Sequence, residues 1–137
     1  MPELYDRYLQ GACQEVYDEM LVMHEHLYEP LIYEEALLVM RELMRRVRVN
    51  IERLITGLHH IGYQFGKGGF WEEFSPEEHL AFSPIVQAPP LATPEFIARL
   101  EHLAGPLPLS LKCWYEEVGG VNLIGLFHHT NRETDPR

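Results

Sequence analysis

The sequence predicts an α+β fold that is predominantly α, with a long N-terminal antiparallel helical hairpin, two short helices and a C-terminal strand. Three observations support this prediction. Apolar residues between Leu31 and Ile61 recur at alternating steps of three and four, the spacing of one helical face. A less regular stripe of the same kind runs from Leu4 to Tyr28. After Gly62 the chain becomes rich in glycine, proline and aromatic residues, and two short helical patterns and one apolar run follow.

The 137 residues are expected to form one domain. We divide it into a helical hairpin, a Gly/aromatic/Pro-rich loop, a helix–helix–strand segment and a polar tail, at residues 1–61, 62–92, 93–127 and 128–137. The formal net charge of −10 argues against nucleic-acid or membrane-surface binding and allows a basic protein partner. Without a signal peptide at Met1 to Asp6 or a membrane-spanning run, we expect a cytoplasmic protein in which Cys13 and Cys113 are reduced, buried thiols.

The first predicted helix runs from Leu4 to Tyr28, and Gly11 weakens it by about 1 kcal/mol relative to Ala. Its polar face is acidic, with Asp6, Glu15, Asp18, Glu19 and Glu25. The helix should end at Glu29-Pro30, because the residue before a proline is disfavoured in helical conformation. So short a break predicts an antiparallel hairpin with the next helix.

The second and longest predicted helix is the spine of the domain. Its buried stripe comprises Leu37, Met40, Met44, Val47, Ile51, Leu54 and Leu58, and its basic cluster comprises Arg41, Arg45, Arg46, Arg48 and Arg53. Residues 1–37 carry nine acids and one base, whereas residues 38–57 carry five bases and two acids. The arginines are therefore expected to pair with the acidic first helix and with Glu42 and Glu52. A phosphate or nucleic-acid site is the less favoured interpretation, because the surrounding field is acidic.

Residues 62–92 are expected to be irregular. Their glycines resemble a phosphate-binding loop only superficially, because no Gly-Lys-Ser/Thr ends the run and Lys67 lies inside it. The aromatic residues are expected to pack this loop over the hairpin. Ala81 to Val86 could form a short strand, and Pro84 would mark it as an edge.

A helix is predicted from Thr93 to Ala104, with Thr93 as its hydroxyl cap and Pro94 in its first turn. Its expected buried residues are Phe96, Ile97, Leu100 and Leu103. A second helix is predicted from about Pro108 to Val118, with Leu111, Trp114 and Tyr115 buried. A strand from Val121 to Phe127 should follow, and its lack of an obvious partner predicts self-association of the chain, as a homodimer, through this end.

The eight histidines are the main candidates for a metal site. The close pairs are His24 and His26, His59 and His60, and His128 and His129. None of them has the spacing of three or four residues that places two histidine rings on one helical face. His24 could meet His59 or His60 only if the hairpin register allowed it, and His128-His129 could bind metal adventitiously. We expect the histidines to lie on the surface or at helix ends. Because no nucleophile–base arrangement is evident and adjacent glutamates diverge on a helix, we expect no cofactor and no enzyme activity.

The run Gly-Pro-Leu-Pro-Leu-Ser-Leu-Lys-Cys-Trp-Tyr-Glu-Glu-Val-Gly-Gly-Val-Asn begins at Gly105. In this run Pro108 opens a helix, and Trp114 and Tyr115 form an aromatic pair within it. Gly119 and Gly120 then let the chain reverse into a strand. The run resembles the SUKH superfamily of fungal cell-wall regulators and bacterial immunity proteins, and the likeness covers residues 93–127. The N-terminal hairpin lies outside the general pattern, although it is similar to a bacterial branch that carries one.

Members of this superfamily continue into a sheet of several strands, whereas this chain ends ten residues after Phe127. Asp135-Pro136 looks like the start of that continuation, so the resemblance implies either a truncated chain or a sheet completed in another way. The family's partner-binding surface lies largely on that sheet. No site residue therefore carries over from the family.

The resemblance implies a non-enzymatic protein-binding module, immunity-like or regulatory, that masks a partner. The net charge indicates that this partner is basic, and the acidic residues Glu15, Asp18, Glu19 and Glu25 form the candidate surface. One alternative is a helical homo-oligomerisation or scaffold module. A remote alternative is a small metal-dependent enzyme built on the helical hairpin.

Overall fold

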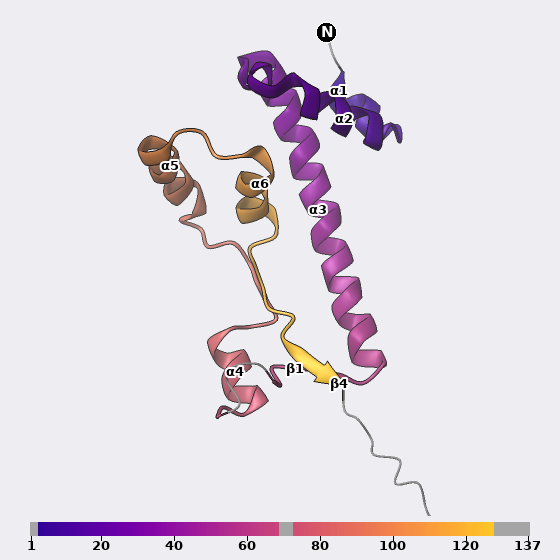
Figure 1. Ribbon diagram of the computed structural model, residues 1–137, viewed down its shortest axis with the longest axis vertical. Helices are drawn as coiled ribbons and strands as arrows, with labels where there is room; N and C mark the ends of the chain where they lie inside the picture. Colours follow the sequence, from indigo (N-terminus) through magenta and orange to yellow (C-terminus); the bar gives the residue numbers. More distant parts are fainter. Residues whose placement is uncertain (1–2, 69–72, 128–137) are drawn as a thin grey trace, which may run out of the picture. The chain divides into compact units, whose positions relative to one another are not determined.

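The computed structural model describes residues 3–68 and 73–127 (Figure 1). The described chain is predominantly helical with short antiparallel strand pairs, which confirms the coarse α+β class. It divides into two compact units, of which unit 1 is Met1–Arg48 with Ala88–Gly119 and unit 2 is Val49–Gln87 with Gly120–Arg137. The boundary falls within one helix, and the single domain stays a prediction. Within the described residues, no helix has the length and apolar character needed to cross a membrane.

The single helix expected over residues 4–28 is wrong. The structure has α1 (Leu4–Leu9), α2 (Cys13–Met23) and a 3₁₀ helix, η1 (His24–Tyr28). Gly11 has a φ of +104°, its N–H bonds to the carbonyl of Tyr8, and the N–H of Ala12 bonds to the carbonyl of Arg7. These two bonds form a Schellman motif. Gly11 therefore ends α1 instead of merely weakening a longer helix.

The spine is confirmed as α3 (Pro30–His60). Its stripe is buried only in the first half, where Leu37, Met40 and Met44 are each 8% exposed or less. Val47 and Ile51 are half-buried, and Leu54 is 49% exposed. In unit 1, α1 and α2 bring Leu4, Tyr8, Val16 and Met20 into the core that contains this first half. The expected long hairpin is thus replaced by two short helices and a 3₁₀ turn.

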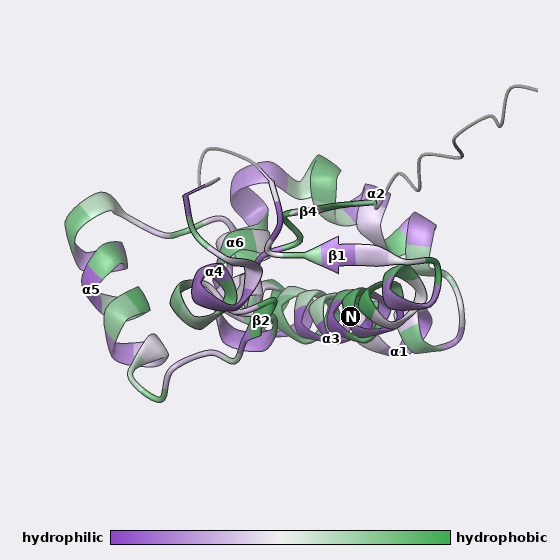
Figure 2. Cartoon of the chain, turned by 90° about the horizontal axis from the view of Figure 1, so that it is seen from below, coloured by the Kyte–Doolittle hydropathy of each residue, from purple (hydrophilic) through white to green (hydrophobic). Residues whose placement is uncertain are grey.

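Unit 1 also contains α5 (Thr93–Ala104) and α6 (Leu109–Glu117), close to the predicted bounds. The Thr93 hydroxyl donates to the carbonyl of Pro90, 2.6 Å away, and Ala92 occupies the cap position, so the expected Thr93 cap is wrong. Figure 2 shows hydrophobic and hydrophilic residues alternating around α5. Of its expected buried face, Ile97 is buried, whereas Phe96 is 59% and Leu103 is 79% exposed.

The buried face expected for α6 also needs correction. Leu111 and Tyr115 are exposed, and Trp114 is half-buried. The residues that α6 and its C-terminus bury are Leu109, Cys113 and Val118. The buried stripe of α6 therefore lies about half a turn away from the predicted one, because the aromatic pair Trp114 and Tyr115 is not its buried anchor.

Residues 62–92, of which 62–87 belong to unit 2, are more regular than expected. They contain β1 (Tyr63–Phe65), α4 (Pro76–Phe82) and β2 (Val86–Gln87). Ser75 caps α4 in a capping box with Glu78, and Pro76 stands in the first turn, so the strand expected from Ala81 is wrong in its first part. Phe65 is buried beneath Tyr63 and His59, while Phe70 and Trp71 lie outside the described residues.

The single strand expected from Val121 to Phe127 is two strands, β3 (Gly120–Val121) and β4 (Gly125–Phe127). β3 pairs antiparallel with β2, with Val86 opposite Val121, and β4 pairs antiparallel with β1, with Gln64 opposite Leu126. The reason for expecting self-association, a strand without a partner in its own chain, is therefore wrong. Self-association itself stays a prediction.

Candidate partner-binding face

The four predicted partner-binding acids lie on two elements of unit 1. Glu15, Asp18 and Glu19 share α2, where steps of three and four place them on one side of the helix. Glu25 lies beyond the break at His24, which has a φ of +45°, and is exposed on η1. Glu15 and Asp18 are exposed, whereas Glu19 forms an ion pair with Arg7 at 2.8 Å.

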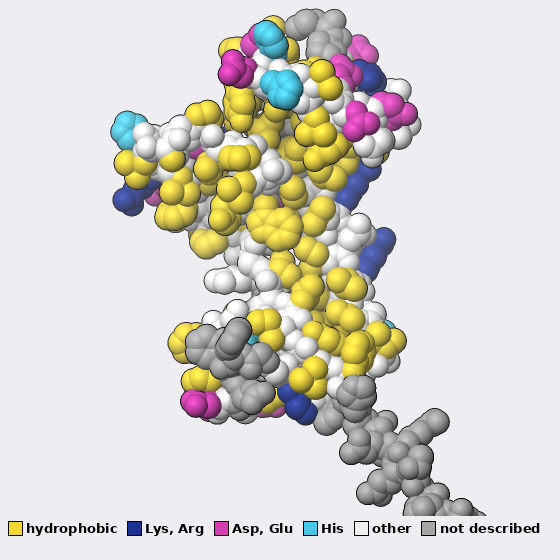
Figure 3. Space-filling model, viewed as in Figure 1, with side chains coloured by type: hydrophobic (Ala, Val, Ile, Leu, Met, Phe, Trp, Pro, Cys, Tyr) yellow, Lys and Arg dark blue, Asp and Glu magenta, His cyan; other side chains and the backbone are white. Residues whose placement is uncertain are grey.

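Exposed apolar side chains lie among these acids, a feature that the sequence analysis did not identify. On α2, Tyr17 is 38%, Leu21 is 57% and Val22 is 75% exposed. Figure 3 shows acidic side chains gathered where α1, α2 and η1 lie, with apolar side chains between them. We call the set Glu15, Tyr17, Asp18, Leu21 and Val22 the α2 face. It combines exposed apolar area with negative charge, a composition typical of protein interfaces with a polar rim.

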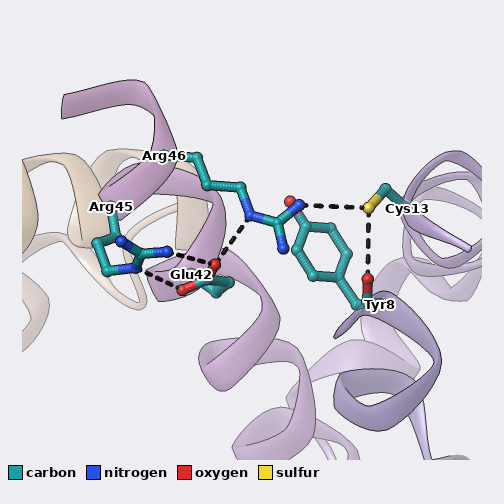
Figure 4. Close-up of polar contacts among 5 residues, drawn as sticks. All are labelled: Tyr8, Cys13, Glu42, Arg45 and Arg46. Atoms are coloured by element: carbon teal, nitrogen blue, oxygen red, sulfur yellow. Dashed lines mark hydrogen bonds and ion pairs between the residues drawn. The ribbon is translucent and has the colours of Figure 1, made fainter. Parts of the chain in front are cut away.

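The spine arginines make a separate cluster with Glu42 (Figure 4). The Glu42 carboxylate accepts two bonds from Arg45, at 2.7 and 2.9 Å, and one from Nε of Arg46 at 2.8 Å. These bonds lower the pKa of Glu42 to about 2, because they stabilise its charged form. Glu42 is therefore paired within α3 with two arginines, which leaves this cluster with an excess of positive charge.

Arg46 also connects α3 to the N-terminal helices. Its guanidinium lies 4.8 Å from the centre of the Tyr8 ring, and its Nη1 is 3.5 Å from Sγ of Cys13 (Figure 4). The Cys13 thiol donates to the carbonyl of Tyr8 at 3.4 Å. Arg46 thus has a packing and hydrogen-bonding role that accounts for its position.

The other spine arginines are directed toward α6. Nε of Arg41 lies 3.2 Å from the Glu116 carboxylate, and Nη1 of Arg48 donates to the backbone carbonyl of Glu117. Pairing with Glu42 was predicted and is confirmed. Pairing with the acidic first helix is wrong, because no described arginine of α3 forms an ion pair with an acid of α1, α2 or η1.

The residues predicted to be structural are found at the ends of α6. Pro108 is its N-cap residue, and Nε1 of Trp114 donates to the carbonyl of Gly119 at 2.9 Å. Gly119 has a φ of +79°, which favours glycine, and Gly120 pairs with Gln87 in the β2–β3 ladder. Tyr115, by contrast, is 43% exposed and anchors nothing in the interior.

The thiols and histidines offer no assembled site in the described residues. Cys13 and Cys113 are free, and burial raises the pKa of the Cys113 thiol to about 11, which makes it a poor nucleophile. No group of three or more His, Cys, Asp or Glu side chains in residues 3–68 and 73–127 is placed to hold a metal ion. His128 and His129, named above for adventitious metal binding, lie outside the described residues.

His79 lies at a helix end, one of the two expected positions, but it is buried and not on the surface. His79 on α4 is only 8% exposed, and its Nε2 lies 3.2 Å from Nδ2 of Asn122. Nδ2 of Asn122 also donates to the carbonyl of Ser83, and Oδ1 accepts from the N–H of Ile124. The Ser-Pro-Glu-Glu sequence at Ser75 is a capping-box signal that could have placed His79 on a helix.

No family model, no curated protein and no solved structure matches the chain.

Proposed function

We propose that this chain is a non-enzymatic protein-binding module, immunity-like or regulatory, that masks a basic protein partner through the α2 face. The observation that carries this proposal is the pairing of the charges. The nine acids of residues 1–37 share one base, Arg7, and that base pairs with Glu19. The described ion pairs of the α3 arginines are with Glu42 and Glu116, so the acids of α1, α2 and η1 receive no ion pair from α3.

An uncompensated acidic field attracts a basic protein and raises the rate of encounter, an effect that salt weakens. Charge alone does not hold a complex together for long. The exposed side chains of Tyr17 and Leu21 supply the apolar contacts that usually carry most of the binding energy at an interface. The α2 face thus combines a steering element with an apolar anchor.

The immunity-like class rests on the resemblance of residues 93–127 to the SUKH superfamily. The order of α5, α6, the glycines and β3 along the chain supports this likeness. Many toxin domains that act on nucleic acids are basic, because they must bind phosphates. An acidic protein that covers such a surface would inhibit it without a cofactor or a catalytic residue.

Helical self-association is the second candidate, since Leu21 and Val22 would be covered equally well by another copy. The acidic character of residues 1–37 opposes it at this face, because two copies would bring like charges together. Multi-angle light scattering over a wide concentration range separates the two candidates. A dimer abolished by Leu21→Ser would favour self-association through α2.

The test of masking is affinity capture from the source cell at low and high salt. The double variant Glu15→Lys/Asp18→Lys reverses two exposed acids and leaves the Arg7–Glu19 pair intact. The matched control is Glu73→Lys/Glu77→Lys, which makes the same charge change at exposed positions of unit 2.

We expect the parent and the control to retain the same basic protein at low salt. The α2 variant should lose it, and Tyr17→Ser should shorten the lifetime of the purified complex. Equal retention by both double variants, or capture of no basic protein at low salt, would contradict the proposal.

A further inference from the structure

Unit 2 contains a hollow of about 310 Å³ between α4 and the segment that joins β3 to β4. Its walls are formed by Phe74, Glu78, His79, Phe82, Ser83, Asn122 and Ile124. This volume is at the lower end of the range for small-molecule sites. The acidic α2 face, in contrast, belongs to unit 1, so the hollow is a separate feature.

The mouth of the hollow exposes an unusual amount of apolar surface. Phe82 is 96%, Phe74 is 50% and Ile124 is 45% exposed. A phenyl ring as exposed as that of Phe82 contributes little to folding. Clustered exposed apolar residues around a concavity are typical of a binding site.

Part of the lining is polar and hydrogen-bonded. The amide of Asn122 has an unambiguous orientation, because Oδ1 accepts from the N–H of Ile124 and Nδ2 donates to the carbonyl of Ser83 at 2.8 Å. Nδ2 of Asn122 also lies 3.2 Å from Nε2 of His79, so the amide and the ring are held together in this part of the lining.

The charge beside the hollow is negative. Glu78 lines it, Glu73 and Glu77 are exposed nearby in the sequence, and residues 73–87 contain no lysine or arginine. An aromatic ring beside a carboxylate favours an organic cation, since the ring face and the acid both attract positive charge.

We propose that this hollow binds a small organic amine, with an apolar ring seated in the hollow and its ammonium group between Phe82 and Glu78. The apolar side chains of Phe74 and Ile124 in the lining accept the ring. The carboxylate of Glu78 selects the cation over a neutral or anionic molecule of the same shape. This site goes beyond the masking function and depends on different residues.

Three probes with the same ring test the proposal: tryptamine, tryptophol and indole-3-acetate, which differ in the charge of the side chain. Each is titrated into the isotope-labelled full chain at pH 7.5 while the backbone amide signals of Glu78, Ser83 and Ile124 are followed by NMR. We expect saturable shifts with tryptamine, binding roughly five- to tenfold tighter than tryptophol, and still weaker binding of indole-3-acetate.

Two variants keep the test independent of folding. Glu78→Gln removes the charge but retains the capping box, since glutamine serves equally at that position. Phe82→Ala removes an exposed ring. The control, Phe96→Ala, removes another exposed ring on α5 in unit 1.

Glu78→Gln should reduce the preference for tryptamine over tryptophol to about twofold or less. Phe82→Ala should weaken the binding of all three probes, and Phe96→Ala should leave the binding of each probe unchanged. The proposal is overturned if tryptamine gives no saturable shift, if tryptophol binds as tightly, or if Phe82→Ala binds like the parent.

Discussion

The side chain of Asn122 donates from Nδ2 to Nε2 of His79 across 3.2 Å, joining positions 43 residues apart. Both residues are buried, and the same amide bonds to the backbone of Ser83 and Ile124. A hydrogen-bonded amide of this kind interrupts a strand, because its side chain takes the bonds that a ladder would otherwise use. The pair therefore explains why β3 and β4 are separate strands and fixes the path of the chain beside α4.

Asn122→Ala is expected to destabilise the protein by about 2–4 kcal/mol, because it leaves a buried ring nitrogen, a carbonyl and an N–H without their partner. Urea unfolding followed by circular dichroism measures the change. Asn50→Ala is the control, since Asn50 is exposed on α3 and alanine suits a helix. If the two variants unfold at the same urea concentration, Asn122 does not hold this segment.

Glu42→Gln should lower the free energy of unfolding by about 1–2 kcal/mol at pH 7. The loss is small because Arg45 and Arg46 are about half exposed and solvent screens their attraction to Glu42. Glu34→Gln, at an exposed position near the start of α3, should change stability little. Comparison of their thermal unfolding midpoints at low ionic strength tests the difference. An equal midpoint for both would show that the Glu42 cluster contributes nothing.

The same cluster predicts that the stability of the fold depends on pH. The pKa of Glu42 is lowered from 4.5 to about 2 in the folded chain, so its stabilisation is fully present above pH 4.5. As the pH falls from 4.5 toward 2, the folded carboxylate takes up its proton and this contribution disappears. The parent should therefore lose more stability than Glu42→Gln over that interval, and parallel curves would contradict the prediction.

Gly125→Ala should disrupt the β1–β4 pair. A Cβ at Gly125 would overlap the carbonyl of Gln64 and come within 2.6 Å of the Tyr63 ring, so the strands would have to separate. Gly57→Ala is the matched control, because Gly57 is helical and its Cβ would meet nothing within 4 Å. We expect faster amide exchange in β1 and β4 for the first variant. The second should gain about 1 kcal/mol of stability.

Charge burial along α3 should have unequal effects. Val39→Asp places a carboxylate at a site that is 1% exposed, and we expect this variant to be unfolded, since the cost of several kcal/mol approaches the total stability of a domain. Ile51→Asp, at a half-buried site, should remain folded with a lower melting temperature. Circular dichroism at 20 °C separates the two outcomes, and a folded Val39→Asp would contradict the burial gradient.

The sequence by itself determined the elements whose signals are local. The stripe of α3 and the Pro94 and Gly105 ends of α5 depend on residues within a few turns of one another, and the structure has both helices near the expected bounds. Gly11 and the Ser75 capping box were also local signals, but the first was read as a weak point in a longer helix and the second was not recognised.

Tertiary structure decided which side of each helix is buried and which charges pair between different elements. The exposed Phe96 and the buried Cys113 show that apolar residues on two sides of a short helix do not identify the packed side, because the neighbouring element makes that choice. Arg41 could have reached acids on several elements, and only the position of Glu116 on α6 directed it there, whereas the pairs of Arg45 and Arg46 with Glu42 lie within one helix and follow from the sequence. The same holds for His79 and Asn122, whose pairing depends on two segments meeting in space, a relationship that no spacing along the chain encodes.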